Sequence, residues 1–277
     1  MDNNIRLIAV DLDGTLLNRK KEMTPRTKEA LAACAEAGII VMPATGRPAT
    51  GFPYVAENLP GFRYALTSNG ALVYDFQEKR AIYEDLLSVE NTLKVIDFAA
   101  DYDLMVDVYT DGNGYSEQRN LDNIRHFFFA EGMIEYVLKT RIPVENMREF
   151  VISRGRPVEK VVLFLSDVSF KPELERLLEP FSFLKVTDAL ENNLELNNST
   201  ANKGAALLRF GERLGIAREQ IMAFGDGRND CDMIRAAGVG VAMANACDEL
   251  KAVADRETLS NEEDGVAWAI EHWALGK

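Results

Sequence analysis

Two aspartates near the amino terminus are the residues best suited to chemistry. They stand in Asp11-Leu12-Asp13-Gly14-Thr15, directly after the apolar run Ile5 to Val10. If that run is a buried strand, the period-2 rule places both carboxylates on the same side of its carboxyl end. Two unit charges about 4 Å apart repel by roughly 4 kcal/mol at an effective dielectric of about 20. The pair therefore needs a cation or a raised pKa on one member, which suggests phosphoryl chemistry; an Asp-Gly turn after a buried strand is the ordinary alternative.

A second acidic motif repeats this arrangement late in the chain. Gly225-Asp226-Gly227-Arg228-Asn229-Asp230 follows the apolar run Ile221 to Phe224. Because the carboxyl ends of parallel strands meet at one edge of a sheet, Asp226 and Asp230 are expected near Asp11. Carboxylates without Cys or His ligands suit a hard cation, Mg²⁺ above all. The alternative for this motif alone is a turn followed by a helix N-cap at Asn229 or Asp230.

Two further motifs add groups that could bind a phosphate. Ala44-Thr45-Gly46-Arg47 follows the apolar run Ile39 to Met42, and its hydroxyl and backbone amides could hold a phosphate oxygen. Lys203 opens a predicted helix, which the helix dipole makes an unfavourable place for a cation. A lysine turned inward at the sheet edge would instead neutralise phosphate charge. Taken singly, the first motif is more typical of a plain strand-to-helix turn, and Lys203 alone is what an exposed lysine would look like.

The elements that would carry these residues alternate between strands and helices. Thr24-Pro25 supplies an N-cap and an N1 proline for a helix that runs to Ala37 and stops at Gly38. A helix is also predicted over Asn202 to Leu214. The predicted strands are Ile5 to Val10, Ile39 to Met42, Tyr64 to Thr67, Ile221 to Phe224 and Val239 to Met243. This order predicts an α/β fold with a doubly wound parallel sheet.

The pattern changes between residues 83 and 188, which we interpret as an inserted α+β domain. Residues 1–82 and 189–277 would then form one continuous catalytic core. No carboxylate cluster recurs at a strand end of the insertion. Its predicted helices are Val89 to Tyr102, Asn120 to Glu131 and Lys171 to Glu179, and its predicted strands are Leu104 to Tyr109, Lys160 to Leu165 and Phe183 to Val186.

Composition narrows the class of protein. The chain has 277 residues and a formal net charge of −13, which argues against broad binding of nucleic acid or anionic membranes. Its three cysteines are widely spaced and its two histidines lie far apart, so carboxylates must carry any chemistry. No apolar run approaches the roughly 18 residues of a membrane span, and no signal-peptide pattern precedes the first strand. We expect a cytoplasmic protein.

The four motifs in order resemble the haloacid dehalogenase (HAD) superfamily of phosphohydrolases. The series is Asp-x-Asp-Gly-Thr, Thr-Gly-Arg, Asn-Lys-Gly and Gly-Asp-x-x-Asn-Asp, and Ser68-Asn69-Gly70-Ala71 extends the similarity. The large insertion between Thr45 and Lys203 is similar in position and size to the cap of the Cof-type subfamily. Ala244, where relatives commonly have glycine, is a local departure that removes no reacting group.

The resemblance implies a role for each matching residue. Asp11 would be the nucleophile that forms an aspartyl-phosphate, and Asp13 would protonate the leaving oxygen and then activate water. Mg²⁺ would be held by Asp11, the backbone carbonyl of Asp13 and Asp226, with Asp230 supporting the metal shell. The remaining implied residues are Thr45, Gly46, Lys203 and Asn229 for phosphate, and Arg47 and Asn69 for the substrate.

Together these features predict a Mg²⁺-dependent phosphatase acting on a small phosphorylated metabolite such as a sugar phosphate. A phosphomutase or phosphotransferase with the same aspartyl-phosphate is the alternative among enzymes. A phosphate-binding regulator without turnover is the alternative from another class, and the presence of Asp13 argues against it.

Overall fold

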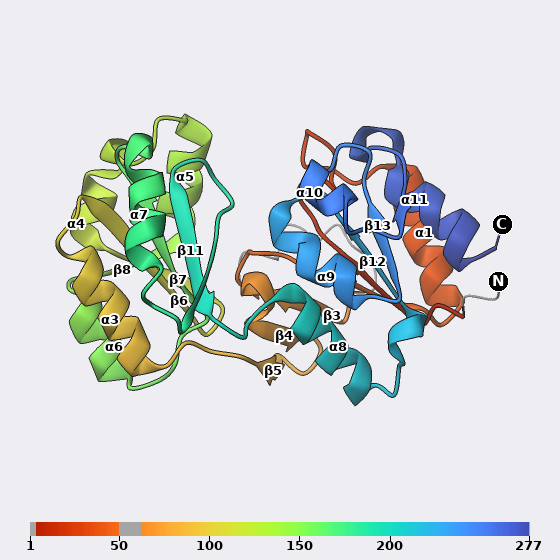
Figure 1. The fold of residues 1–277 in the computed structure, drawn as a ribbon, viewed down its shortest axis with the longest axis horizontal. Helices are drawn as coiled ribbons and strands as arrows, with labels where there is room; N and C mark the ends of the chain where they lie inside the picture. Colours follow the sequence, from red (N-terminus) through yellow and green to blue (C-terminus); the bar gives the residue numbers. More distant parts are fainter. Residues whose placement is uncertain (1–3, 50–61, 277) are drawn as a thin grey trace. The chain divides into compact units, whose positions relative to one another are not determined.

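The computed structural model describes residues 4–49 and 62–276, which form two compact units (Figure 1). The first unit contains residues 4–46, 62–84 and 202–276, and the second contains residues 85–201 together with 47–49. The second unit is thus an insertion in the first. Among the described residues, no helix combines the length and the apolar character needed to cross a membrane.

The first unit is built on five parallel strands in the order β14–β13–β12–β1–β2. Strands β1 and β12 lie at the centre and are buried along their whole length, as expected for a parallel sheet covered on both faces. The predicted doubly wound α/β fold is confirmed. The strands are β1 (Leu7–Val10), β2 (Ile40–Pro43), β12 (Ile221–Gly225), β13 (Val239–Ala242) and β14 (Arg256–Glu257).

Helices cover this sheet on either side (Figure 1). Helix α1 (Pro25–Glu36) packs against α11 (Gly265–Ala269), and α8 (Lys203–Arg213) packs against α9 (Cys231–Ala236). The predicted cap of α1 is present, because the Thr24 side chain accepts a hydrogen bond from the Thr27 amide. Asn202 caps α8 in the same way through the Ala205 amide at 2.8 Å. Helix α10 (Asp248–Lys251) completes this unit.

The strand predicted at Tyr64 to Thr67 exists as β3, but its place in the parallel sheet was wrong. It pairs antiparallel with β4 (Leu72–Asp75), which pairs with β5 (Arg80–Glu84), so a separate three-stranded sheet forms. A single parallel bridge between Ala44 and Leu66 joins β3 to the chain after β2. The short turn at residues 68–70 lets β4 fold back onto β3 and take up its backbone hydrogen bonds.

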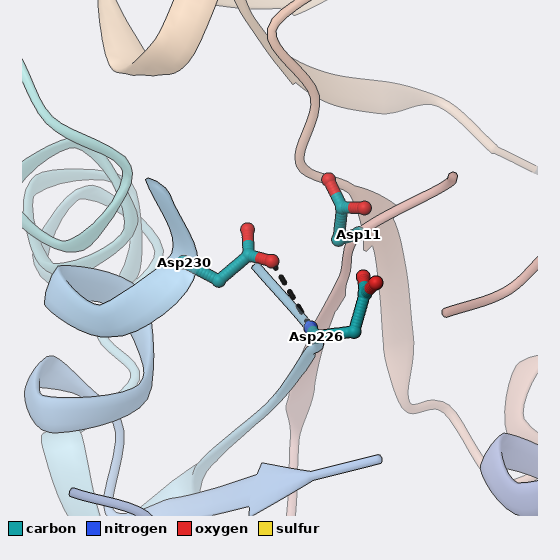
Figure 2. A group of neighbouring side chains, drawn as sticks. All are labelled: Asp11, Asp226 and Asp230. Atoms are coloured by element: carbon teal, nitrogen blue, oxygen red, sulfur yellow. Dashed lines mark hydrogen bonds between the residues drawn. The ribbon is translucent and has the colours of Figure 1, made fainter. Parts of the chain in front are cut away.

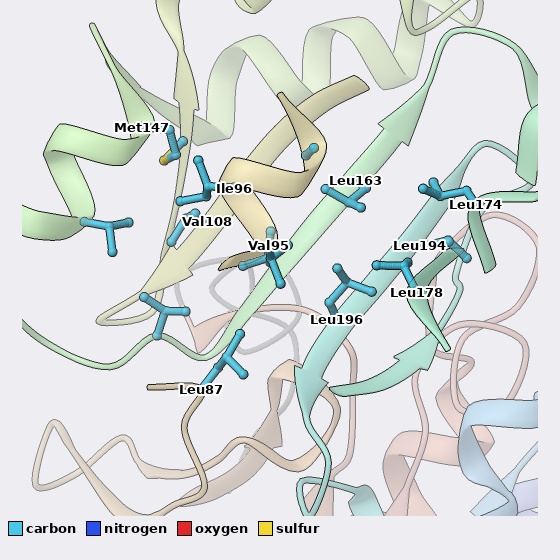
Figure 3. Close-up of a cluster of buried hydrophobic side chains, with 14 of the residues drawn as sticks. Leu87, Val95, Ile96, Val108, Met147, Leu163, Leu174, Leu178, Leu194 and Leu196 are labelled. Atoms are coloured by element: carbon cyan, nitrogen blue, oxygen red, sulfur yellow. The ribbon is translucent and has the colours of Figure 1, made fainter. Parts of the chain in front are cut away.

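The second unit is a six-stranded sheet with helices, in the strand order β10–β11–β9–β6–β7–β8. One apolar cluster joins side chains of α3 and α7, such as Val95 and Leu174, to Leu163 and Leu194 of the sheet (Figure 3). A second cluster contains Phe127 and Phe128. The elements are α3 (Val89–Ala99), β6 (Leu104–Thr110), β7 (Asn113–Glu117), α4 (Gln118–Asp122), α5 (Glu131–Thr140), β8 (Arg141–Val144), α6 (Met147–Arg154), β9 (Lys160–Leu165), α7 (Lys171–Leu178), β10 (Leu184–Thr187) and β11 (Asn193–Asn198).

Two expectations for this unit differ from the structure. The single helix predicted over Asn120 to Glu131 is wrong: α4 ends at Asp122, a 3₁₀ turn spans Ile124–His126, and α5 begins at Glu131. Helical conformation is lost at Asn123, and the buried rings of Phe127 and Phe128 follow in the segment between the two helices. The boundary predicted at Asp188 lies one strand too early, because β11 pairs with β9 and the unit extends to Ala201.

Candidate active site

Three carboxylates meet at the carboxyl edge of the parallel sheet. β1 and β12 pair in register, Val10 with Phe224, and the Asp11 amide donates to the Phe224 carbonyl at 3.0 Å. Asp11 and Asp226 therefore follow neighbouring strands. Asp230 closes the 3₁₀ turn after β12, and each of the three carboxylates has an oxygen within 4.8 Å of the others (Figure 2).

Lys203 joins two of these carboxylates. It is the first residue of α8 and is buried, with Nζ 2.7 Å from Asp11 Oδ1 and 2.5 Å from Asp230 Oδ1. Burial by itself lowers the pKa of Lys203, but the charges of Asp11 and Asp230 outweigh it and raise that pKa. The lysine is therefore held as a cation inside the site.

The site is short of positive charge. With all three carboxylates ionised and Lys203 protonated, the four side chains carry a net charge of −2. Burial, reinforced by the charge of Asp230, raises the pKa of Asp11 to about 8, and burial raises the pKa of Asp226 to about 6. Oxygen-only ligands with a deficit of two charges match the donor set of a hard divalent cation. The residues present thus fit Mg²⁺.

Backbone hydrogen bonds and close packing fix the acidic side chains. The second oxygen of Asp230 accepts a hydrogen bond from the Asp226 amide at 3.1 Å (Figure 2). It accepts another from the Gly227 amide, also at 3.1 Å. Gly14 has a φ of +89°, and a Cβ there would collide with the Asp226 carboxylate. The glycine of the first motif is therefore required both by its conformation and by the close approach of Asp226.

Asp13 is not one of the three grouped carboxylates, although its charge contributes to the raised pKa of Asp226. Its side chain is 37% exposed, and Oδ1 contacts Lys21 Nζ at 2.6 Å. Lys21 was not predicted, since an exposed lysine in a polar connection gives no signal of its own. No role was predicted for Thr15 either, whose hydroxyl donates to Asp226 Oδ1 at 2.8 Å. The available signal was that Thr15 belongs to the first motif, Asp-x-Asp-Gly-Thr.

The remaining predicted site residues are Thr45, Gly46, Arg47, Asn69 and Asn229. Thr45 is buried after β2, where its amide donates to the Leu66 carbonyl at 2.8 Å and its carbonyl accepts from the Asn69 amide at 3.2 Å. Asn69 is buried too, whereas Gly46, Arg47 and Asn229 are half-buried. The structure thus connects Thr45 directly to Asn69, and the substrate roles of Arg47 and Asn69 stay predictions.

Comparisons with known proteins identify the family of this chain. The haloacid dehalogenase-like hydrolase family model matches residues 8–270. The chain is 32% identical over 279 residues to 5-amino-6-(5-phospho-D-ribitylamino)uracil phosphatase YcsE of Bacillus subtilis, across 99% of this chain and 98% of that protein. It is 30% identical over 265 residues to pyridoxal phosphate phosphatase YbhA of Escherichia coli, across 96% and 97%.

A solved structure of the same family has a similar fold. The crystal structure of a haloacid dehalogenase-like hydrolase from Bacteroides thetaiotaomicron superimposes with a TM-score of 0.81 at 32% identity, over 97% of this chain and 99% of that one. The match extends through both units. With its carboxylates gathered at the edge of a parallel sheet, this chain belongs to the haloacid dehalogenase-like hydrolase family.

Proposed function

We propose that this protein is a Mg²⁺-dependent phosphatase that hydrolyses a small phosphorylated metabolite through an aspartyl-phosphate on Asp11. The observation that carries the proposal is the buried contact of Lys203 with Asp11 and Asp230, beside Asp226. This arrangement combines a carboxylate nucleophile with a fixed cation where phosphoryl charge would develop. In phosphoryl transfer, such positioning and electrostatic stabilisation supply most of the catalysis.

Asp11 is the residue that we assign as the nucleophile. Its oxygen attacks phosphorus in line, and the bond from phosphorus to the alcohol oxygen of the substrate breaks. Water then attacks the aspartyl-phosphate, which releases inorganic phosphate and restores the carboxylate. Lys203, already in contact with Asp11, neutralises charge on the phosphoryl oxygens, and Thr45 with Gly46 and Asn229 would bind those oxygens.

Asp13 suits the role of general acid and base better than that of nucleophile. It is the more exposed of the two aspartates in the first motif, at 37% of its side chain against 11% for Asp11. An exposed carboxyl can exchange its proton with solvent between the two half-reactions. We therefore assign it the proton given to the leaving oxygen and later taken from water.

Asp11, Asp226 and the backbone carbonyl of Asp13 would hold Mg²⁺, with Asp230 supporting the metal shell. Bound Mg²⁺ would offset the two excess negative charges and let the anionic phosphate approach Asp11. Thr15 would then orient Asp226 through its hydrogen bond to Oδ1.

The substrate class rests on the relatives. Two of them are named for different small phosphorylated compounds, and both align along nearly the whole chain. We propose a phosphomonoester of comparable size, a sugar phosphate being the first class to try. The second unit would supply the selectivity. The cytoplasmic location and the absence of nucleic-acid and membrane partners stay predictions from the sequence.

The test is a phosphate-release assay on a panel of phosphorylated metabolites, each with Mg²⁺ and with excess chelator. We expect release from at least one substrate that depends on Mg²⁺. Release that survives the chelator would refute the metal dependence. Transfer to an added alcohol or a second hydroxyl of the substrate, in place of water, would identify a phosphotransferase or phosphomutase instead. No release and no transfer with any substrate would favour a phosphate-binding regulator.

A further inference from the structure

The turn between β3 and β4 has an unusual backbone. Ser68, Asn69 and Gly70 follow one another with φ values of 50°, 60° and 97°, all in the left-handed region. Residues with a Cβ avoid this region, and a left-handed conformation costs roughly 1–2 kcal/mol per residue. All three residues are buried. A strained segment of this kind persists only where its surroundings fix it, and such segments cluster at functional sites.

On one side, this turn holds Thr45. The Asn69 amide donates to the Thr45 carbonyl at 3.2 Å, and Leu66, just before the turn, accepts from the Thr45 amide at 2.8 Å. Both backbone polar groups of Thr45 are therefore bound to β3 and its turn. Because β3 does not belong to the parallel sheet, these bonds come from a separate element.

On its other side, the turn touches the start of α8. A Cβ on Gly70 would collide with the backbone carbonyl of Asn202 and would lie 2.8 Å from the Lys203 amide nitrogen. Asn202 is the N-cap of α8, and Lys203 is its first residue. The turn thus reaches the backbone from which the buried lysine extends toward Asp11.

We propose that the left-handed turn Ser68–Asn69–Gly70 is a positioning device that sets Thr45 and Lys203 relative to each other. These two residues lie far apart in sequence, and the turn contacts the backbone of both. The proposal rests on the proposed function in one respect, namely that Thr45 and Lys203 bind the same phosphoryl group. It assigns no direct contact with substrate to the turn.

Gly70→Ala tests the device, and Gly38→Ala is its matched control. Both glycines have positive φ, +97° and +75°, so both alanines carry a similar backbone strain. Only at Gly70 does the new methyl group meet neighbouring backbone, since nothing lies within 4 Å of a Cβ on Gly38. We expect Gly70→Ala to lower kcat at least tenfold and to weaken competitive inhibition by inorganic phosphate at least tenfold. Gly38→Ala should change neither value by more than about twofold.

A folded Gly70→Ala protein with the kcat and phosphate inhibition of the wild type would overturn the proposal. So would an equal loss of kcat in Gly38→Ala, because strain alone would then explain the effect. Thermal unfolding of both variants checks that they are folded.

A measurement on the unchanged protein covers the case in which Gly70→Ala does not fold. Hydrogen exchange is followed in the presence of Mg²⁺, once with and once without inorganic phosphate. We expect phosphate to slow exchange in peptides covering residues 66–71 as well as those at Thr45 and Lys203. Slowing at Thr45 and Lys203 without any slowing at 66–71 would overturn the positioning role. No slowing anywhere would count against the proposed phosphate site itself, which separates the two failures.

Discussion

Lys203 and the carboxylates around it determine the charge balance of the site. The lysine contacts Asp11 and Asp230, while the hydroxyl of Thr15 binds Asp226. Burial makes every one of these charges costly to leave uncompensated. Burial, with a smaller contribution from the neighbouring carboxylates, raises the pKa of both Asp11 and Asp226 and so favours their neutral forms. Proton uptake and cation binding are therefore alternative ways of neutralising the same residues.

Asp11→Asn should abolish turnover without unfolding the protein. Asparagine has the same size but cannot form the acyl phosphate, so we expect kcat to fall by about 10³-fold or more. Folding should survive, because burial disfavours the charged form of Asp11. Phosphate release and circular dichroism measure the two effects. Asp101→Asn, at an exposed position of the second unit, is the control with unchanged activity. Hydrolysis near the wild-type rate in Asp11→Asn would reject the nucleophile.

The affinity for Mg²⁺ should rise with pH. In the metal-free protein the pKa of Asp11 is about 8 and that of Asp226 about 6, so below these values each carboxyl holds a proton that the cation must displace. Between pH 6 and 8 one proton is displaced, which predicts roughly a tenfold gain in affinity per pH unit, levelling off above pH 8. Calorimetric titrations at several pH values measure this. A constant affinity from pH 6 to 8 would contradict it.

At the scale of elements, the packing of α8 against α9 places Lys203. Gly204 lies at this contact, where a Cβ would collide with the carbonyl of Asp232. The glycine costs helix stability, since alanine is favoured by about 1 kcal/mol in a helix. The close packing of α8 against α9, which only a glycine permits here, offsets that loss of helix stability. The sequence Asn202-Lys203-Gly204 thus combines a cap, a buried cation and a helix contact.

Gly204→Ala should destabilise the protein despite its better helix propensity. Overpacking against a fixed carbonyl costs typically about 1–3 kcal/mol, more than the gain of about 1 kcal/mol. Because Lys203 is the adjacent residue, kcat should fall as well. Gly132→Ala in α5, where no atom lies within 4 Å of the new Cβ, should instead be neutral or stabilising by up to about 1 kcal/mol. Urea unfolding compares them, and a more stable Gly204→Ala protein would contradict the packing argument.

At the scale of the whole molecule, the chemistry belongs to one compact unit. The three carboxylates and Lys203 all come from residues 4–46, 62–84 and 202–276. The chain passes into the second unit after Glu84 and returns at Asn202, directly before Lys203. The insertion therefore leaves the sheet and its acidic edge complete, and the second unit contributes none of these four side chains.

Mg²⁺ should stabilise the first unit selectively. A ligand at 100 times its Kd stabilises the state that binds it by about 2.7 kcal/mol. We expect slower hydrogen exchange with Mg²⁺ than with chelator in peptides of the first unit, most strongly around Asp11 and Asp226. Peptides from residues 85–201 should exchange equally in both conditions. Equal protection of both units would show that the cation acts elsewhere.

The α/β fold, the positions of the core strands along the chain and the meeting of Asp11 with Asp226 could be predicted from the sequence. Apolar runs followed by acidic turns are local patterns, and parallel strands bring their carboxyl ends to one edge whatever lies between them. The cap of α1 was predicted too, because Thr24 binds an amide only three residues ahead.

Which distant backbones and charges pair became clear from the folded structure alone. Strand periodicity identifies β3 but not its partner, so its separate sheet with β4 came from pairing that the pattern does not encode. The contact of Asp13 with Lys21, the double contact of Lys203 and the left-handed turn at Ser68–Gly70 likewise depend on neighbours brought in by folding. The physical reason is that each of these contacts joins groups that the fold brings together, and for Lys203 the burial that strengthens its coupling to Asp11 and Asp230 exists only in the assembled molecule.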